Sequence, residues 1–208
     1  MSFIDNYKVA LWLNRLKKNG NVVKGLEELY SKYRGEDDLL FALVAADAVD
    51  ENGQKLLPLC FIKGEVVCIL ICLIDQTTGD KYLLLVRQRR ICDGSLIYEH
   101  PAGMLDGERD PYRVAIREVW EETGVEISRD QLKSLSSKLL FPSTGTSDEA
   151  MYFFYTEIVW PLERIRSFDQ QKRGEVSENE NITTHVLPFA EAYRLITNTN
   201  GLLHCFLY

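Results

Sequence analysis

The sequence lacks the features of a secreted or membrane-spanning protein. No uninterrupted apolar run approaches the ~20 residues that a membrane-spanning helix requires. Near the N-terminus, Asp5 and Lys8 interrupt the apolar stretch, and the positive charges follow it instead of preceding it, unlike in a signal peptide. We therefore expect no membrane partner.

An excess of positive charge is also absent. The 24 lysine and arginine residues stand against 31 aspartate and glutamate residues, which gives a net charge of −7. Binding to the nucleic-acid backbone requires a basic face, so we expect no nucleic-acid partner. An acidic protein can still bind a phosphorylated small molecule if a metal ion supplies positive charge locally.

No CxxC pair occurs among the five cysteines. Their odd number and spacing argue against a disulfide framework and against a zinc site. Cys60, Cys68 and Cys72 lie in apolar runs, where a thiol usually packs as a small hydrophobic group. Reduced thiols of this kind indicate a cytoplasmic location.

The chain does contain enough apolar material for a substantial core, with 46% hydrophobic residues among 208. We expect an N-terminal extension over residues 1–55, mostly helical and able to form a dimer contact, followed by the main domain over residues 56–208. The helical expectation rests on apolar residues that recur at roughly helical spacing. These residues are Val9, Leu11, Leu13, Leu16, Val23, Leu26, Leu29 and Tyr30.

The main domain is expected to be α+β. Strands are predicted over residues 58–75, 81–90, 96–98, 133–140, 150–158 and 183–187, and helices over 111–122 and 189–197. Because strands and helices do not alternate regularly, the pattern favours a mixed sheet flanked by helices.

The predicted helix after residue 110 has clear boundary signals. Asp110 is a suitable N-cap, Pro111 suits the first helical position, and Gly124 suits the position after the helix end. Within it, Glu118, Glu121 and Glu122 share one face, because they stand at i, i+3 and i+4. Such carboxylates repel one another, and a hard divalent cation would remove the conflict. A solvated acidic surface is the alternative interpretation.

The residues from Arg117 to Val125 read REVWEETGV, which resembles the second half of the Nudix box, R-E-U-x-E-E-x-G-U with U aliphatic. Gly103 stands at the distance from Arg117 that this family shows. The resemblance implies a Nudix-type α/β/α sandwich and binding of Mg²⁺, with Mn²⁺ as a possible substitute. It also implies that Glu118, Glu121 and Glu122 bind the metal, and that Gly103, Arg117 and Gly124 support the box.

The sequence departs from the box at one position. The family has a glutamate at the position of Arg109, and that glutamate supports the loop and pairs with the box arginine. Here Glu108 stands beside Arg109. Either Glu108 takes over this role through a shifted loop, or Arg117 has another partner.

Flanking segments resemble the branch that hydrolyses ADP-ribose and other nucleotide sugars. Residues 99–103 resemble the E-x-P-A-G motif of that branch, which implies that Glu99 binds substrate and that the Ala102 carbonyl joins the metal ligands. Arg89 and Arg90 are candidates to contact the diphosphate, or they solubilise a strand end. Glu149 follows an altered S-P-G-x-x-x-E loop and either contacts the substrate or caps the next strand.

The segment 175–182, EVSENENI, resembles a loop that carries a catalytic glutamate in bacterial ADP-ribose pyrophosphatases. Glu180 is the first candidate for the base and Glu178 the second, with Glu122 also counted among the catalytic residues. A charged surface loop without a role is the alternative. The N-terminal extension of related enzymes often forms a dimer, so the resemblance also implies a homodimer.

Together these residues predict metal-dependent hydrolysis of the diphosphate linkage of a nucleoside diphosphate sugar, most readily ADP-ribose or an ADP-sugar. Two alternatives stay open. The substrate could be coenzyme A, a dinucleoside polyphosphate or an oxidised nucleotide triphosphate. The domain could also have lost catalysis and sense a nucleotide, which Arg109 alone favours.

Overall fold

The computed structural model describes residues 3–174 and 181–208, in two compact units that interleave along the chain. Unit 1 comprises residues 1–66, 104–109 and 140–151, and unit 2 comprises residues 67–103, 110–139 and 152–208. The expected boundary between residues 55 and 56 falls inside unit 1. Among the described residues, no helix is long and apolar enough to cross a membrane.

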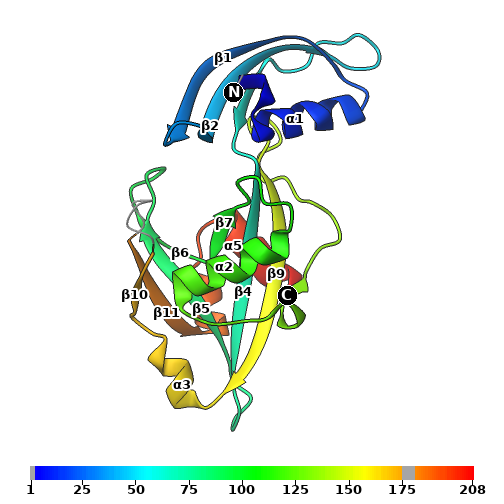
Figure 1. Ribbon diagram of the computed structural model, residues 1–208. Helices are drawn as coiled ribbons and strands as arrows, with labels where there is room; N and C mark the ends of the chain where they lie inside the picture. Colours follow the sequence, from blue (N-terminus) through cyan, green and yellow to red (C-terminus); the bar gives the residue numbers. More distant parts are fainter. Residues whose placement is uncertain (1–2, 175–180) are drawn as a thin grey trace. The chain divides into compact units, whose positions relative to one another are not determined.

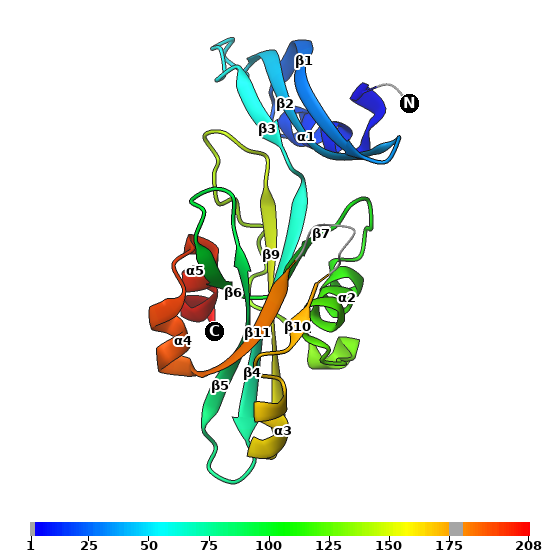
Figure 2. The same ribbon diagram turned by 90° about the vertical axis from the view of Figure 1, so that its left-hand side faces the viewer.

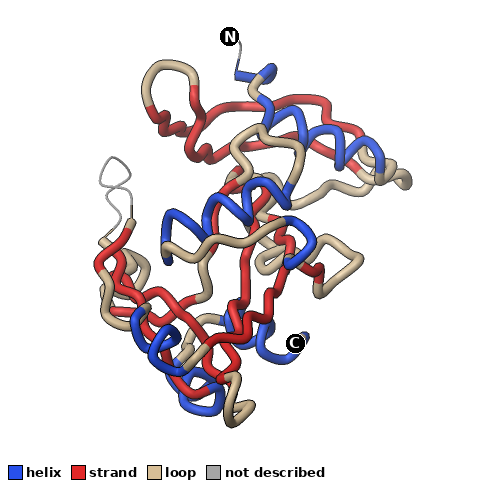
Figure 3. The backbone as a smooth tube through the Cα atoms, turned by 60° about the horizontal axis from the view of Figure 1, so that its bottom comes forward, coloured by secondary structure: helices blue, strands red, loops and turns tan. Residues whose placement is uncertain are grey.

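Unit 1 is built on a three-stranded sheet in the order β1-β2-β3. Its elements are η1 (Phe3–Asp5), α1 (Tyr7–Lys18), β1 (Val22–Arg34), β2 (Asp38–Val49) and β3 (Leu59–Ile62). Both strand pairs are antiparallel, and α1 lies along the sheet (Figure 3). Val9 and Trp12 of α1 pack against Leu39 and Val44 of β2, which makes the core of this unit.

The expectation of a mostly helical extension is wrong for residues 22–49. Residues 7–18 are helical as expected, but the next apolar residues belong to a long antiparallel hairpin. Two bulges in β1 each insert one residue, at Lys24 and Leu29. The bulge at Leu29 lies between Leu26 and Tyr33 and brings both onto the same face of the sheet, where they pack on the core, although they stand seven positions apart. This bulge therefore gives a spacing that a helix face also shows.

Unit 2 contains most of an eight-stranded sheet, in the order β10-β11-β5-β4-β9-β8, with β6 pairing with β5 and β7 with β4 (Figure 1). Its strands are β4 (Glu65–Asp75), β5 (Lys81–Arg89), β6 (Leu96–Glu99), β7 (Ala102–Met104), β8 (Lys133–Ser134), β9 (Ala150–Trp160), β10 (Lys172–Arg173) and β11 (Ile182–Pro188). Its helices are α2 (Pro111–Thr123), η2 (Arg129–Gln131), α3 (Leu162–Ser167), α4 (Phe189–Leu195) and α5 (Thr199–Leu207).

The sheet is mixed, as expected. β5 runs antiparallel to β4, β6 and β11. β4 and β9 are parallel, because backbone hydrogen bonds join their corresponding ends. The Ala150 amide donates to the Gly64 carbonyl at 3.3 Å where the two strands begin, and the Gln76 amide donates to the Trp160 carbonyl at 3.0 Å where they end.

Helices cover both faces of this sheet, which confirms the α/β/α sandwich. Figure 2 shows α2 on one side and α4 and α5 on the other. Leu70 and Leu85 project toward α4 and α5 and pack against Ala192 and Ile196. β4 is buried along almost its whole length, as expected for a central strand covered on both faces.

Two predicted strands differ from the observed ones. Residues 58–75 form two strands instead of one, because Gly64 at φ 88° turns the chain out of the three-stranded sheet and into the larger one. Of residues 133–140, only Lys133–Ser134 form a strand, and Leu140 makes an isolated bridge to Met151. The helices α3 and α5 were not predicted.

Candidate active site

Helix α2 begins and ends at the residues that the sequence indicates. The Asp110 side chain accepts a hydrogen bond from the Tyr112 amide at 3.1 Å and pairs with Arg129 at 2.6 Å. At the other end, Gly124 has φ 74° and its amide donates to the Trp120 carbonyl. A side chain at Gly124 would also collide with Arg173, because a Cβ would lie 2.2 Å from Nη2. The helix is therefore held at both ends.

Glu118 lies directly against the backbone of β7 at Gly103. A Cβ placed on Gly103 would lie 2.1 Å from Cδ of Glu118 and 2.3 Å from Oε1, closer than real atoms approach. Only glycine allows this contact, which explains the box glycine in physical terms. The Glu118 side chain is 13% exposed. Its carboxylate therefore fills the space that a side chain on Gly103 would occupy.

Glu122 reaches the neighbouring residue of the same strand. It is 2% exposed, and its Oε2 accepts a hydrogen bond from the Ala102 amide at 3.1 Å. The strand segment is anchored on its other side, because the Pro101 carbonyl accepts from the Ile69 amide of β4 at 2.8 Å. Glu118 and Glu122 thus converge on two successive residues of β7.

Arg117 binds the carboxylates of its own helix. Its Nη2 donates to Oε1 of Glu118 at 2.8 Å, and its Nε lies 3.6 Å from Oε2 of Glu121. Glu121 is the more exposed of the two carboxylates, at 49% against 13% for Glu118. Arg117 thus contacts two of the three carboxylates of this helix face, and we call Glu118, Glu121 and Glu122 the acidic cluster.

The acidic cluster fits a hard divalent cation in its chemistry. All of its potential metal ligands are oxygens, which magnesium prefers. The space at Gly103 holds the carboxylate of Glu118, and the carboxylate of Glu122 lies at the neighbouring residue, Ala102. In the described part of the chain, no three His, Cys, Asp or Glu side chains are already arranged as a closed metal site. Arg117 occupies part of the carboxylate surface. A cation at the acidic cluster would compete with this arginine.

Arg89 and Arg90 are placed differently from each other. Arg90 Nε donates to Oε2 of Glu99 at 2.7 Å, so two of the expected substrate-binding residues form an ion pair. Arg89 Nη1 donates to the Gly94 carbonyl within the following turn. Both arginines are exposed at the end of β5.

Other predicted residues lie outside this group. Glu108 and Glu149 belong to unit 1. There, Glu108 accepts from the Arg109 amide at 2.8 Å, and Glu149 pairs with Lys63. Glu178 and Glu180 lie outside the described residues, so their roles stay predictions from the sequence.

Sequence reasoning missed Arg87 and Arg173. The Arg87 guanidinium lies over the Tyr98 ring at 5.0 Å, and its buried Nε has no hydrogen-bond partner among the described residues. Arg173 covers the glycine at the end of α2 and donates to Gln171 at 2.8 Å. Both arginines come close to the box elements only when the chain folds. No local sequence pattern therefore indicates their roles.

A buried neutral histidine lies behind the strand that carries the site. His204 Nε2 donates to the Phe154 carbonyl at 2.7 Å, so Nδ1 is the acceptor that faces the Cys68 thiol at 3.4 Å. Burial, aided by the neighbouring His100, lowers the pKa of His204 well below its usual value. This part of the core therefore depends on an uncharged imidazole.

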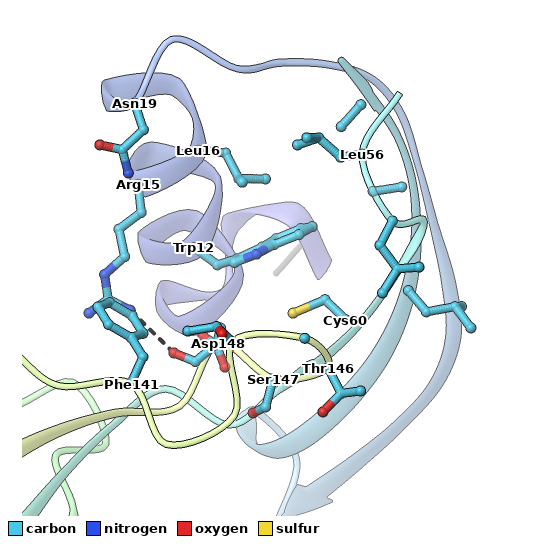
Figure 4. Close-up of a pocket in the computed structure, with 16 residues that line it drawn as sticks. Trp12, Arg15, Leu16, Asn19, Leu56, Cys60, Phe141, Thr146, Ser147 and Asp148 are labelled. Carbon is cyan, nitrogen blue, oxygen red and sulfur yellow. Dashed lines mark hydrogen bonds between the residues drawn. The ribbon is translucent and has the colours of Figure 1, made fainter. Parts of the chain in front are cut away.

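Unit 1 contains a cavity of about 370 Å³ beside α1 (Figure 4). Trp12 and Leu16 project into it from α1, and Arg15 lies at its edge. The Arg15 guanidinium lies 5.5 Å from the centre of the Phe141 ring and donates to the Asp148 carbonyl at 3.5 Å. All of its lining residues belong to unit 1, so the acidic cluster does not line it.

Comparison with known proteins agrees with the resemblance in the box. A family model described as NUDIX domain matches residues 65–201. The chain is 32% identical over 177 residues to Nudix hydrolase 14, chloroplastic, of Arabidopsis thaliana, covering 81% of this chain and 57% of that protein. It is 32% identical over 101 residues to the ADP-ribose pyrophosphatase of Bacillus subtilis (strain 168), covering 49% of this chain and 52% of that protein.

The aligned regions thus span little more than half the length of each of these two relatives. Among solved structures, one described as the crystal structure of ADP compounds hydrolase superposes with a TM-score of 0.62 at 18% identity. It covers 90% of this chain and 91% of the other. At this identity the likeness shows a shared fold.

Proposed function

This chain belongs to the Nudix family, and we propose that it hydrolyses the diphosphate linkage of a nucleoside diphosphate sugar. The products would be a nucleoside monophosphate and a sugar phosphate. One observation carries the proposal above the others: Glu118 and Glu122 converge on the backbone of Ala102 and Gly103. This arrangement concentrates negative charge at a glycine-lined cradle, as an enzyme that binds metal and phosphate requires.

The acidic cluster, together with the Ala102 carbonyl, would hold Mg²⁺ or Mn²⁺. When bound, such a cation neutralises phosphate charge and lowers the pKa of coordinated water. Arg117 orients two carboxylates through its contacts with Glu118 and Glu121. Because Glu122 also binds the Ala102 amide, helix and strand are tied together where the substrate phosphates would approach.

The choice of substrate rests on residues outside the acidic cluster and on the relatives. The E-x-P-A-G segment is present, and its Glu99 already pairs with Arg90. Arg87 of β5 and Arg90, which directly follows this strand, would supply cationic groups for a diphosphate. The Bacillus relative bears the name ADP-ribose pyrophosphatase, which supports ADP-ribose or an ADP-sugar. We assign the role of the base to Glu180, with Glu178 as the second candidate. A homodimer in the cytoplasm stays a prediction from the sequence.

The test is turnover of a substrate panel with magnesium, in the presence and absence of a chelator. The panel contains ADP-ribose, ADP-glucose, UDP-glucose and GDP-mannose, with coenzyme A, a dinucleoside tetraphosphate and an oxidised nucleoside triphosphate as rivals. A phosphatase converts the monoester products to inorganic phosphate, and chromatography identifies the nucleotide released. We expect chelator-sensitive release of a nucleoside monophosphate from an ADP-sugar.

Glu122→Gln tests the site itself. We expect kcat to fall by at least about 100-fold, because the loss of a supporting interaction alone can cost 10–100-fold. Glu126→Gln is the matched control, since Glu126 is exposed just beyond the helix end. If all substrates are inert while a nucleotide sugar still raises the melting temperature, the chain is a sensor and the hydrolase proposal is wrong. If the protein hydrolyses only coenzyme A or only a dinucleoside polyphosphate, the proposed substrate class is wrong and that compound's class replaces it.

A further inference from the structure

The loop of the box has an unusual backbone. It comprises residues 104–109, from the last residue of β7 to the residue before Asp110, the N-cap of α2. Asp106 has φ 48° and Gly107 has φ 90°. Glycine adopts such angles readily, but for aspartate the left-handed region is costly. The conformation at Asp106 therefore requires support from its surroundings.

Side chains of the N-terminal extension provide that support. Lys8 Nζ of α1 lies 3.0 Å from Oδ1 of Asp106, and Arg34 Nη2 of β1 pairs with Oδ2. The Tyr7 hydroxyl donates to Oδ1 at 3.4 Å. We call these four residues the Asp106 network. Both carboxylate oxygens are thus bound by groups that lie far away in the sequence.

Lys8 contacts this loop through its ammonium group. Its side chain is fully buried, which is rare for a lysine and costly without a counter-charge. Its Nζ donates to the Leu40 carbonyl at 3.0 Å and lies 3.8 Å from the sulfur of Met104, another residue of the loop. The aliphatic part of Lys8 packs against Gly64. The lysine is therefore enclosed on several sides and has little freedom to move.

Charge in the Asp106 network is well balanced. Arg34 also pairs with Asp38 at 2.8 Å, so two cations face two carboxylates. Although burial by itself raises it, hydrogen bonds from Arg34 and Lys8 hold the pKa of Asp106 below its usual value. Asp106 stays ionised near neutral pH, and its partners stay attached.

We propose that Asp106 is a positioning residue, through which Lys8 and Arg34 of the N-terminal extension hold the box loop in its working conformation. The family pattern places a supporting glutamate at position 109, where this chain has Arg109. The Asp106 network supplies the support instead, from the extension. The loop leads directly from the Gly103 cradle to the N-cap of α2, so its conformation affects where the strand and helix of the site begin. The proposal rests on the hydrolase function proposed above.

The experiment measures kcat, KM and the magnesium concentration for half-maximal activity, with ADP-ribose or the best substrate of the panel. Asp106→Gly removes the carboxylate but keeps a residue that adopts φ 48° without strain. Asp106→Asn keeps the shape but removes the charge and replaces one acceptor oxygen with an amide donor. We expect kcat to fall about 10- to 100-fold, as for a misplaced reacting group, with a higher magnesium requirement and little change in KM.

Arg34→Gln is a milder variant for the case that substitutions at Asp106 prevent folding, because the Arg34 side chain is 28% exposed. Arg34→Lys should restore part of the lost activity. In a double-mutant cycle, Arg34→Gln combined with Asp106→Asn should cost less than the sum of the single changes. Lys18→Met and Asp37→Asn, exposed residues of α1 and of the turn before β2, are the charge-matched controls.

The proposal is wrong if folded Asp106→Gly and Arg34→Gln both keep the kcat and magnesium requirement of the unchanged protein. Loss of stability with unaltered kinetics of the folded fraction would reduce Asp106 to a structural role and also overturn the proposal. If the unchanged protein hydrolyses no substrate, the proposed function fails separately. Hydrogen exchange of amides 104–109 then tests the anchor, with faster exchange expected in Arg34→Gln and equal exchange contradicting it.

Discussion

Asp106 and the acidic cluster of α2 lie in one continuous stretch of sequence but have opposite electrostatic settings. In the acidic cluster, Arg117 contacts two of the three carboxylates, Glu118 and Glu121. In the Asp106 network, Lys8 and Arg34 bind both oxygens of a single carboxylate. The first gathers carboxylates on one helix, whereas the second surrounds one carboxylate with cations from distant elements.

This difference separates a binding site from a structural support. Carboxylates gathered on one helix face repel one another, and a bound cation relieves this repulsion. A partly buried carboxylate with two cationic partners, such as Asp106, stabilises the folded chain only while its partners remain. Substitutions in the acidic cluster should therefore cost activity first, and substitutions in the Asp106 network should cost stability as well.

The largest effect on stability is expected from Lys8→Met, which keeps the length of the side chain but leaves Asp106 with one partner fewer. We expect the free energy of unfolding to fall by roughly 3 kcal/mol, near the lower end for a broken buried ion pair because Arg34 remains. Urea denaturation measures it, with Lys18→Met as the control. Glu122→Gln should change stability far less in the same assay. An equal loss in both variants would contradict the distinction between a binding site and a structural support.

A smaller expected effect, on activity, comes from Gly103→Ala. The new Cβ would lie 2.1 Å from Cδ of Glu118, so the carboxylate must move away from β7. Misplacement of about 1 Å can cost on the order of 100-fold in rate, and we expect a loss of that size in kcat. Steady-state kinetics with saturating magnesium measures it. Gly145→Ala, at an exposed glycine where an added Cβ meets nothing within 4 Å, tests for a general effect of an added methyl group. Near-normal kcat in Gly103→Ala would contradict the cradle.

The smallest effect concerns His204, a buried polar side chain in a setting without charge. Because burial holds the folded-state pKa of His204 well below 6.5, the unfolded chain takes up a proton more readily in acid. Its contribution to stability is therefore complete above about pH 6.5 and is lost as the pH falls below it. Urea denaturation between pH 7 and pH 5 should show a shallower decline for His204→Gln than for the unchanged protein. Parallel declines would show that His204 does not titrate on unfolding.

The sequence by itself determined helix α2 and the order of residues on it. Asp110 and Gly124 mark its ends through local backbone chemistry, and the helical period alone places Glu118 and Glu122 on one face. The central strand β4 was also predictable, since a continuous apolar run indicates burial on both faces.

Only the tertiary structure decided how the rest is arranged. The strands over residues 22–49 depend on pairing with each other and contain bulges. The spacing of their apolar residues, taken alone, predicts a helix. Two contacts join residues that meet only after the chain folds. They are the contact of Glu118 with Gly103 and the ion pair of Lys8 with Asp106. Local preferences act over a few neighbouring residues, whereas these contacts arise from packing between elements far apart in the sequence.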